Sequence, residues 1–397
     1  MEPPLIIFHA FVSLALLLVW LNSLATLFFV RRPRLVPAAA DAPFVSILVP
    51  ARNEARRIAL CLASLAAQDY PRFEVLMLND HSDDDTRRCA EEVGFASEGR
   101  LRILSGEALP SGWIGKAWAC DQLARAAGGD YLLFTDADTV HAPEMLAAAI
   151  GEATRTRASL LSLWPRQITG SLGEKAVIPL LYLAAAGMVP HFIIAAAQTS
   201  PRLAKFFSRS FLRSNGVANG QFLLFRRADY FALGGHAAVR NHLVEDVALG
   251  RRVAARIVDG FRLVNGDGTS LVQCRMYESL AETWFGFTKN CRAAFEESLG
   301  GFLSAGVTQV MIFLAPFALL FVSGPQRWFA LTEVSAIYGL RFLHAIRYRS
   351  TLLGALFHPL GEIIGLLIAL NSWRRSAGAG VEWKGRIYKV VHESATL

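Results

Sequence analysis

The first thirty residues contain the feature that most constrains how this chain can fold, an apolar run almost free of charge. Residues 5–30 read LIIFHAFVSLALLLVWLNSLATLFFV. A run of this length can cross the hydrocarbon core of a bilayer, which is about 30 Å thick. It is preceded by MEPP and followed by the basic cluster RRPR, whereas a cleavable signal peptide starts with basic residues. The sequence therefore predicts an N-terminal transmembrane anchor over residues 1–34, with the N-terminus outside and residue 31 onward in the cytoplasm.

The overall composition indicates a soluble domain combined with membrane segments. Of the 397 residues, 53% are hydrophobic and only 18% are charged, which is too apolar for an ordinary soluble protein and too charged for a protein that is membrane-embedded throughout. The net charge is +7, and basic residues cluster beside the apolar runs, which is typical of loops that touch anionic lipid. The soluble part has no basic face with interleaved aromatics, so no nucleic-acid partner is expected. The five cysteines are scattered without metal-binding spacing, which favours reduced thiols.

Further apolar segments lie in the middle and near the end of the chain. Residues 176–198 are interrupted by prolines, and we expect them to dip into the cytoplasmic leaflet as an interfacial segment. Candidate spans in the C-terminal region 301–372 are 303–323, 328–346 and 352–370. Three crossings would put the basic tail 373–397 outside, and two crossings with one re-entrant segment would keep it inside; the sequence leaves both open. Either way, a multi-pass protein of the cytoplasmic (inner) membrane is expected, with its soluble domain in the cytoplasm.

Between these segments, short apolar runs alternate with helical patterns. Strands are expected at 44–50, 73–80, 101–106 and from residue 131, with helices over 54–68, 82–94 and 116–128. This alternation predicts an α/β domain, placed here at 43–300, with a mostly parallel, Rossmann-like sheet. Parallel sheets bind ligands beyond the carboxyl ends of their strands. Two of the expected strands end in acid there, at Asp80 and in the pair Asp136 and Asp138, so these carboxylates are candidate site residues rather than chance loop acids.

Six motifs occur in an order that resembles one enzyme family: VSILVPARNEARRI, EVLMLNDHSDDDT, GWIGKAWACDQ, YLLFTDADT, NGQFLLFRRADYFALGG and LVEDVALGRRV. The chain is similar to family 2 glycosyltransferases, inverting enzymes with the GT-A fold. Within that family it resembles membrane enzymes that act on lipids: the hopene-associated and carotenoid-type bacterial glycosyltransferases and, more distantly, ceramide glucosyltransferase. The resemblance implies transfer of a sugar, with UDP as the expected nucleotide, to a lipid hydroxyl.

The resemblance also assigns the donor site. Asp138 is the expected ligand of a Mg²⁺ or Mn²⁺ ion, since such hard cations prefer oxygen and bridge phosphate oxygens. Asp136 is expected near the ribose or the metal, and Asp80 at the base or ribose, although Asn79 replaces an Asp common in relatives. The ammonium of Lys116, at an expected helix start, suits a diphosphate. The remaining donor or acceptor contacts are assigned to Pro50, Asn53, Glu54, Asn219, Gly220 and Gln221, with Glu54 alternatively capping its helix.

A second acidic pair is assigned to the acceptor side. Single displacement with inversion needs a base that takes the proton from the attacking hydroxyl. The resemblance implies that Asp246 is this base and that Glu245 supports it. The same two acids would also suit the N-terminus of a helix, which is compatible with the catalytic role.

The chain departs from the family pattern after residue 280. Many relatives carry a Q/R-x-x-R-W motif there, and this chain reads LAETWFGFTKN instead. Lys289 is the hypothetical substitute for the diphosphate contact, and Trp383, Lys384 and Arg386 in the tail are interpreted as lipid-surface anchors. Two alternatives remain open at this stage: a processive polysaccharide synthase of the same fold and a non-catalytic membrane scaffold.

Overall fold

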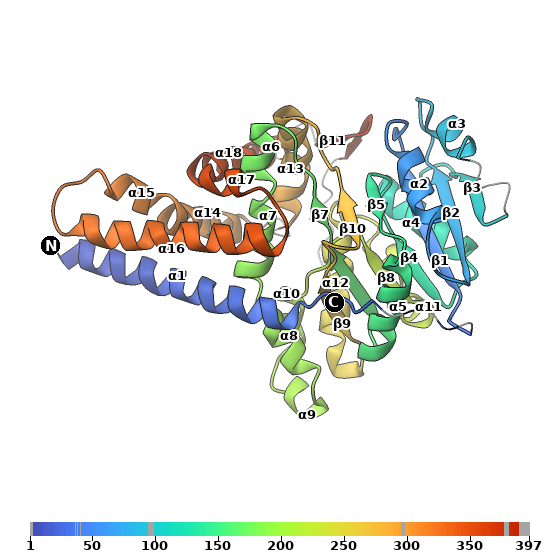
Figure 1. The fold of residues 1–397 in the computed structure, drawn as a ribbon, viewed down its shortest axis with the longest axis horizontal. Coiled ribbons are helices and arrows are strands. Elements are labelled where there is room, and N and C mark those ends of the chain that lie inside the picture. Colours follow the sequence, from blue (N-terminus) through green and yellow to red (C-terminus); the bar gives the residue numbers. More distant parts are fainter. Residues whose placement is uncertain are drawn as a thin grey trace. The chain divides into compact units, whose positions relative to one another are not determined.

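The computed structural model describes residues 3–35, 37, 39, 41–93, 99–294, 298–376 and 381–388. The chain divides into two compact units (Figure 1). We call Leu24–Ile168 with Val189–Met276 the α/β unit, and Met1–Ser23, Thr169–Met188 and Tyr277–Leu397 the helical unit. The chain thus leaves the α/β unit before the expected boundary at residue 300.

The α/β unit is built on a seven-stranded sheet. Strands β1 to β4 run parallel to one another, β8 runs antiparallel to both of its neighbours, and β6 pairs with β9 in parallel. The predicted mostly parallel sheet is therefore confirmed, with one reversed strand that the sequence did not reveal. In spatial order the strands are β3 (Leu101–Ser105), β2 (Phe73–Asn79), β1 (Val45–Ala51), β4 (Tyr131–Phe134), β8 (Leu223–Arg226), β6 (Leu160–Trp164) and β9 (Leu263–Asp267).

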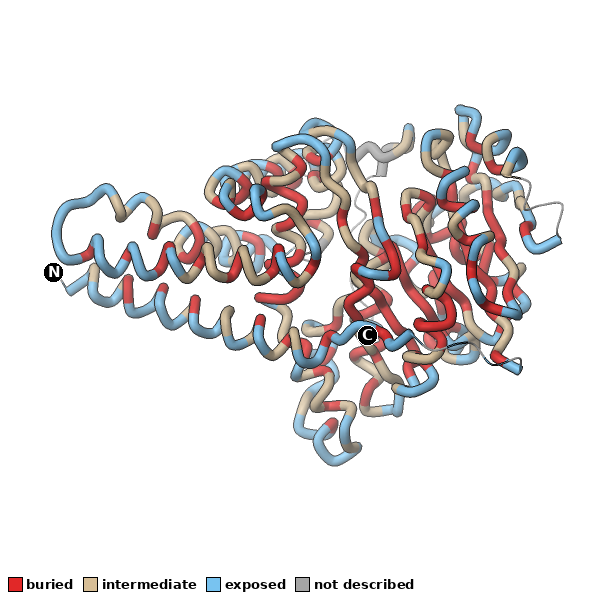
Figure 2. Tube along the Cα trace, in the orientation of Figure 1, coloured by how far each residue is buried: buried red, intermediate tan, exposed pale blue. Residues whose placement is uncertain are grey.

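Helices cover both faces of this sheet. In β1, Val45, Ile47 and Val49 contribute to one buried cluster, and Leu48 contributes to the other, because successive side chains of a strand point to opposite faces. Helices α2 and α5 belong to the first cluster, and α4 and α12 belong to the second. Figure 2 shows the buried residues concentrated along these strands. The helices of the unit are α2 (Ile58–Ala66), α3 (Thr86–Glu91), α4 (Gly115–Ala126), α5 (Met145–Thr156), α8 (His191–Ala197), α9 (Pro201–Ala204), α10 (Arg209–Ser214), α11 (Arg227–Ala232) and α12 (Glu245–Ala255), with the 3₁₀ turns η3 (His236–Val239) and η4 (Ile257–Asp259).

The α/β unit also contains a smaller three-stranded sheet, and an ion pair links the segment after the N-terminal helix to the larger sheet. β5 (Thr139–His141), β10 (Val272–Cys274) and β7 (Arg166–Gln167) pair in that order. In the segment that follows the N-terminal helix, Arg32 Nε lies 2.9 Å from the buried carboxylate of Asp267 at the end of β9. The RRPR cluster thus has a partner within the fold, in addition to the membrane-side role predicted from sequence.

The helical unit contains the remaining helices. Val12 and Leu16 of α1 pack with Ile337 and Leu340 of α16, while the other side of α1 exposes leucines. The elements are α1 (Pro3–Phe29), which continues past the unit boundary, α6 (Leu172–Val177), α7 (Leu180–Tyr182), the π-helical turn η2 (Leu183–Met188), α13 (Leu280–Ala294), α14 (Leu299–Phe313), α15 (Ala315–Leu319), α16 (Gln326–Arg347), α17 (Leu352–Leu356), α18 (His358–Ser376) and the hairpin β11 (Val381–Trp383) with β12 (Arg386–Tyr388).

Two helical segments among the described residues are long and apolar enough to cross a membrane. These are Pro3–Phe29 and Leu299–Leu319, and a third candidate is the pair Leu172–Met188 and His191–Ala197, bent by 44°. The N-terminal span and the first C-terminal candidate match the sequence expectation. The stretches expected at 328–346 and 352–370 do not meet this test, because α16 carries buried charged residues and because the second stretch is divided between α17 and α18. Of the expected tail, residues 377–380 and 389–397 lie outside the described residues.

Candidate active site

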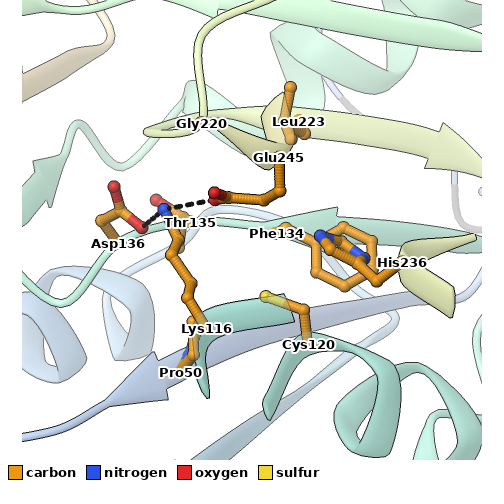
Figure 3. A pocket seen from close by; sticks show the side chains of 10 residues that line it. All are labelled: Pro50, Lys116, Cys120, Phe134, Thr135, Asp136, Gly220, Leu223, His236 and Glu245. Atoms are coloured by element: carbon orange, nitrogen blue, oxygen red, sulfur yellow. Dashed lines mark ion pairs between the residues drawn. The ribbon is translucent and has the colours of Figure 1, made fainter. Parts of the chain in front are cut away.

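A small pocket lies at the carboxyl ends of the central strands in the α/β unit (Figure 3). Because β1 and β4 are adjacent and parallel, Pro50 at the end of β1 and Asp136 just after β4 reach the same edge of the sheet. Lys116 enters from the start of α4, and Glu245 enters from the start of α12. The pocket is lined by Pro50, Lys116, Cys120, Phe134, Thr135, Asp136, Gly220, Leu223, His236 and Glu245.

Lys116 joins two acids that come from distant parts of the sequence. Its Nζ lies 2.7 Å from Asp136 Oδ1 and 2.9 Å from Glu245 Oε1, as Figure 3 shows. Although burial lowers it, the pKa of Lys116 is raised well above its usual value by Asp136 and Glu245. Burial likewise opposes ionisation of Glu245, but Lys116 holds the pKa of that carboxyl below its usual range. Lys116 and Glu245 are therefore both charged at neutral pH, and the ammonium lies between two acidic side chains.

Asp246 occupies a different environment from its neighbour. Its Oδ2 accepts a hydrogen bond of 2.6 Å from the Gly220 N–H, and its Oδ1 accepts one of 2.8 Å from the Val247 N–H. Burial, followed by the charge of Glu245, raises the pKa of Asp246 to about 6. A Cβ at Gly220 would lie 2.9 Å from Asp246 Oδ2, so only glycine allows this approach. The result is a carboxylate that is oriented by the backbone and basic enough to accept a proton near neutral pH.

The second acidic strand end, at Asp80, is fixed by the turn that follows β1. Asp80 is 6% exposed, and Arg52 donates hydrogen bonds of 2.7 Å to the backbone oxygens of Asp80 and His81. His81 Nδ1 lies 3.3 Å from Asp80 Oδ1. Asn53 and His81 both adopt a positive φ, of 53° and 54°, which is uncommon outside glycine and costs conformational energy.

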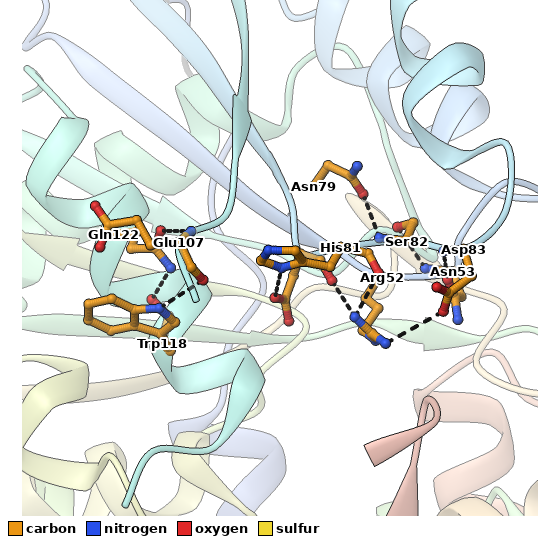
Figure 4. A network of polar contacts seen from close by, with 10 residues as sticks. Arg52, Asn53, Asn79, His81, Ser82, Asp83, Glu107, Trp118 and Gln122 are labelled. Carbon is orange, nitrogen blue, oxygen red and sulfur yellow. Dashed lines mark hydrogen bonds and ion pairs between the residues drawn. The ribbon is translucent and has the colours of Figure 1, made fainter. Parts of the chain in front are cut away.

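Side chains of the two turns lock these backbone conformations (Figure 4). The Asn53 N–H donates to Ser82 Oγ at 3.0 Å, and the Asp83 N–H donates to Asn53 Oδ1 at 2.9 Å. Asn79, the departure from the family pattern, accepts from the Ser82 N–H at 3.3 Å. The β1 and β2 turns therefore form one rigid wall beside Asp80.

Glu54 lies in this wall and is not the N-cap of the following helix. α2 begins at Ile58, its N-cap residue is Arg57, and that cap has no side-chain hydrogen bond. The Glu54 N–H donates instead to Thr86 Oγ1 at 2.7 Å, which ties the turn to the start of α3. The expected helix over 54–68 is thus shorter at its N-terminus, and the capping alternative for Glu54 is wrong.

The Asp136 and Asp138 pair forms the turn between β4 and β5. The backbone oxygen of Asp136 accepts from Thr139 Oγ1 at 2.6 Å, and that of Asp138 accepts from the Arg275 N–H at 3.1 Å. Within the part of the chain that the structure describes, no three His, Cys, Asp or Glu side chains gather as a metal site. Two carboxylates without a closed protein cage fit a hard cation whose remaining ligands are phosphate oxygens and water.

Of the three residues assigned near position 220, Asn219 and Gln221 do not line the pocket. The amide of Gln221 is buried, accepts from Gln167 Nε2 at 2.7 Å and donates to Cys274 Sγ at 3.0 Å, so it joins the smaller sheet to the loop. Asn219 Oδ1 accepts from the Gln221 N–H at 3.0 Å, which shapes the loop that presents Gly220. Of these three residues, only Gly220 lines the pocket.

Sequence reasoning missed several pocket residues, above all Thr135 and His236. Thr135 Oγ1 donates to the Gln221 carbonyl at 2.8 Å and lies 3.1 Å from His141 Nε2. His236 Nδ1 lies 2.9 Å from the Tyr230 hydroxyl, and burial lowers the pKa of His236 to about 4, so the imidazole is neutral. The only local signal was Gly234–Gly235, whose positive φ values turn the chain into η3. The other missed residues, Cys120, Phe134 and Leu223, form apolar walls of the pocket; they lie within the quoted motifs, but no role was assigned to them.

The remaining assigned residues lie in the helical unit. Lys289 is half-buried in α13, and Lys384 occupies the tight turn of the β11–β12 hairpin with a φ of 48°. Their proposed contacts with diphosphate and with lipid remain predictions.

Comparison with known proteins agrees with this geometry. Residues 46–228 match the model of the family "Glycosyl transferase family 2". The chain carries a family 2 glycosyltransferase domain. It is therefore an enzyme of the glycosyltransferase class. The matched segment contains the β1 and β2 turns, Lys116, the Asp136 and Asp138 pair and Gly220, whereas Glu245 and Asp246 lie beyond it.

The matches with a curated relative and with a solved structure extend over most of the chain. The chain is 27% identical over 363 residues to the 4,4'-diaponeurosporenoate glycosyltransferase of Staphylococcus aureus strain USA300, covering 88% of this chain and 89% of that protein. Among solved structures, it is similar to the mannosyltransferase PcManGT from Pyrobaculum calidifontis, which was determined in complex with GDP-Man and Mn²⁺. That match has a TM-score of 0.53 at 18% identity and covers 92% of this chain and 97% of that one, which confirms the GT-A fold.

Proposed function

We propose that this enzyme transfers a sugar from a UDP-linked donor to a hydroxyl group of a lipid acceptor, with inversion at the anomeric carbon. The observation that carries the proposal is Asp246, a carboxylate with a pKa of about 6 that is held by two backbone N–H groups beside the pocket. As a base it takes the proton from the acceptor hydroxyl as that oxygen attacks the sugar. Glu245 supports Asp246 in two ways: it holds Lys116 in place through an ion pair, and its negative charge raises the pKa of Asp246.

The donor occupies the carboxyl ends of β1, β2 and β4 in this proposal. Asp80 accepts from the nucleobase or the ribose, and the rigid wall formed by Pro50, Asn53 and Glu54 cups the nucleotide. Asp136 and Lys116 lie next to the diphosphate, where an ammonium at a helix start is favourable for an anion. Because hydrogen bonds within the wall restrict its conformations, little conformational entropy should be lost when the nucleotide binds.

Asp138, with Asp136, would hold a Mg²⁺ or Mn²⁺ ion. When bound, such an ion neutralises the diphosphate and helps it to leave. The acids that would hold the ion follow β4, whereas the base begins α12, so the two functions are carried by separate elements. This separation suits a single displacement, in which the nucleophile and the leaving group lie on opposite faces of the sugar.

A membrane acceptor is supported by the composition of α9 and α10 as well as by the candidate spans. Within the α/β unit, residues 200–214 expose Leu203, Phe206 and Phe211, and the Phe206 side chain is 83% exposed. The same segment contains four basic residues and no acidic one: Arg202, Lys205, Arg209 and Arg213. Aromatic and basic side chains on one exposed segment are typical of contact with an anionic bilayer surface. The name of the S. aureus relative, a diaponeurosporenoate glycosyltransferase, also points to an apolar acceptor. We propose a multi-pass protein whose α/β unit faces the cytoplasm.

The proposal is tested with the full-length protein purified in detergent. We would incubate it with UDP-, GDP- and dTDP-sugars and bacterial lipid extracts, with Mg²⁺, Mn²⁺ or EDTA, and identify products by mass spectrometry. A new glycolipid formed from a UDP-sugar, with the opposite anomeric configuration by NMR, is the expected result. A retained configuration would refute the single displacement, and products carrying many sugars would indicate a processive synthase. No transfer or donor hydrolysis under any condition would refute the enzymatic assignment.

A further inference from the structure

A second polar cluster lies in the helical unit, on the buried face of α16 near its C-terminal end. Arg341 and His344 are one helical turn apart, and each is 2% exposed. A guanidinium Nη1 of Arg341 donates to the Pro179 carbonyl at 3.1 Å, and His344 Nε2 lies 3.2 Å from Ser23 Oγ. Among the described residues, Arg341 Nε and His344 Nδ1 have no hydrogen-bond partner. Two buried polar atoms are thus left unsatisfied within one turn of helix.

No acid of the described chain forms an ion pair with this arginine. Glu362 is near enough to act on Arg341 electrostatically, but no carboxylate oxygen lies within 4.0 Å of the guanidinium. The Glu362 carboxylate is directed to other groups, with Oε2 accepting from Gln309 Nε2 at 2.7 Å and Oε1 lying 3.7 Å from His358 Nδ1. A buried charge without a close partner is costly, so the fold retains a strongly unfavourable group at this position.

Arg341 and His344 line a small pocket of their own. Its other walls are Pro179, Ala345, Ser350, Thr351 and Ala355, which combine apolar surfaces with two hydroxyl groups. The walls are held together by very close packing of α17 on the end of α6, since a Cβ at Gly354 would overlap the Lys175 carbonyl oxygen. The α16 helix ends with Arg347, and Arg349 follows, so further positive charge lies close in sequence.

We propose that this pocket binds the oxyanion of a membrane amphiphile, a carboxylate or a phosphate group. The guanidinium supplies charge and a free N–H, and Ser350 and Thr351 at the pocket wall carry hydroxyl groups that can donate further hydrogen bonds to an oxyanion. The amphiphile is favoured over a soluble anion because the same unit contains α1 and the Leu299–Leu319 segment, both long enough to span a bilayer. The site goes beyond the proposed transfer reaction and stands on the helical unit alone, so its test needs no enzymatic turnover.

The test measures binding to the full-length protein in a neutral detergent. Oleate and oleyl alcohol share one chain and differ in the anion; phosphatidylglycerol and phosphatidylcholine differ in net charge; inorganic phosphate is an anion without a chain. Native mass spectrometry and thermal unfolding would record binding of each. We expect oleate or phosphatidylglycerol to bind and to raise the unfolding temperature more than its neutral counterpart, with inorganic phosphate weaker. Equal effects of oleate and oleyl alcohol, together with equal effects of the two phospholipids, would refute an anion site, and equal effects of inorganic phosphate would refute the amphiphile.

Variants assign the effect to Arg341. Arg341→Met should weaken anion binding roughly 10- to 100-fold, the range expected for loss of a charge-assisted hydrogen bond, and Arg341→Lys should recover part of it. Arg327→Met is the matched control, because Arg327 is exposed on the same helix, and it should leave binding unchanged. Unchanged binding in Arg341→Met would overturn the proposal.

A further variant separates a ligand site from an internal ion pair. Glu362→Gln removes the nearest competing negative charge, so it should strengthen anion binding if the pocket is a ligand site. If Arg341 and Glu362 instead neutralise each other, Glu362→Gln will destabilise the protein, the double variant Arg341→Met/Glu362→Gln will restore its stability, and no anion will bind more tightly. That pattern would also overturn the proposal.

Discussion

Each unit contains a cation beside acidic or polar groups, and Lys116 and Arg341 differ in how closely those groups pair with them. Lys116 has carboxylate oxygens at 2.7 and 2.9 Å, so its charge is neutralised within the α/β unit. Arg341 has a carbonyl oxygen at 3.1 Å and an unsatisfied Nε. A cation between two acids fixes the geometry of the groups around it, whereas one with spare hydrogen-bonding capacity is prepared for an anion from outside. Lys116 therefore holds Asp136 and Glu245 together in the proposed transfer site.

The largest expected effect concerns Asp246, which forms no ion pair with Lys116. Asp246→Asn keeps the size of the side chain but removes the base, so we expect the transfer rate to fall roughly 100- to 10,000-fold. Binding of the nucleotide-sugar, measured by calorimetry, should remain within a factor of a few, as should anion binding at Arg341. Full transfer activity in this variant would remove Asp246 from the mechanism.

Stability measurements test whether Lys116 is paired with acids inside the protein while Arg341 is not. Lys116→Met leaves Asp136 and Glu245 close together without their shared counter-ion, which we expect to cost about 3 kcal/mol of unfolding free energy. Arg341→Met removes a charge without a close partner, so in the absence of ligand it should cost less than about 1 kcal/mol or be stabilising. Thermal and chemical unfolding of the full-length protein in detergent would compare them, with Lys116→Arg as the charge-retaining control. Equal losses for the two methionine variants would show that both cations are paired internally.

Adding a single methyl group at Gly354 tests how closely α17 packs on α6 in the wall of the Arg341 pocket. Gly354→Ala would bring a Cβ against the Lys175 carbonyl, and overpacking of this kind costs about 1 to 3 kcal/mol. Gly300→Ala is the matched control, because a Cβ there meets nothing within 4 Å, and it should change stability by less than about 1 kcal/mol. Anion binding at Arg341 should weaken in the first variant only. Wild-type stability in Gly354→Ala would mean that α6 and α17 are not in close contact.

The smallest expected effect is a shift in the pH dependence of transfer. A base works when it is deprotonated, so with a pKa of about 6 the rate should be constant above pH 7 and fall below pH 6, by about tenfold per unit at lower pH. Glu245 raises the pKa of Asp246, so Glu245→Gln should lower that pKa and move the fall in rate to lower pH. An initial-rate profile of both proteins measures the shift; movement to higher pH would contradict the electrostatic coupling.

Much of the α/β unit could be predicted, because its signals are local. The strand boundaries around β1 to β4 follow from runs of buried apolar residues, and the positions of Asp80, Asp136 and Asp138 follow from the rule that parallel strands end at one edge. The helix expected from Glu54 begins later, at Ile58, because the intervening residues form the turn bonded to Thr86 and Ser82. The contacts of the Gln221 side chain could not be predicted from the sequence either, because its partners Gln167 and Cys274 lie in strands of a separate sheet.

The sequence by itself determined the long apolar N-terminal helix, the α/β pattern and the carboxylates at the strand ends, since periodicity, composition and residue type act within a few neighbouring residues. Only the tertiary structure decided which charges meet. It brought Lys116 between Asp136 and Glu245, placed the backbone of Gly220 against Asp246, and gave Arg32 its partner Asp267. It also left Arg341 without a close carboxylate. The energy of a buried charge depends on atoms within a few ångströms in space, and the order of residues along the chain does not specify which atoms those are.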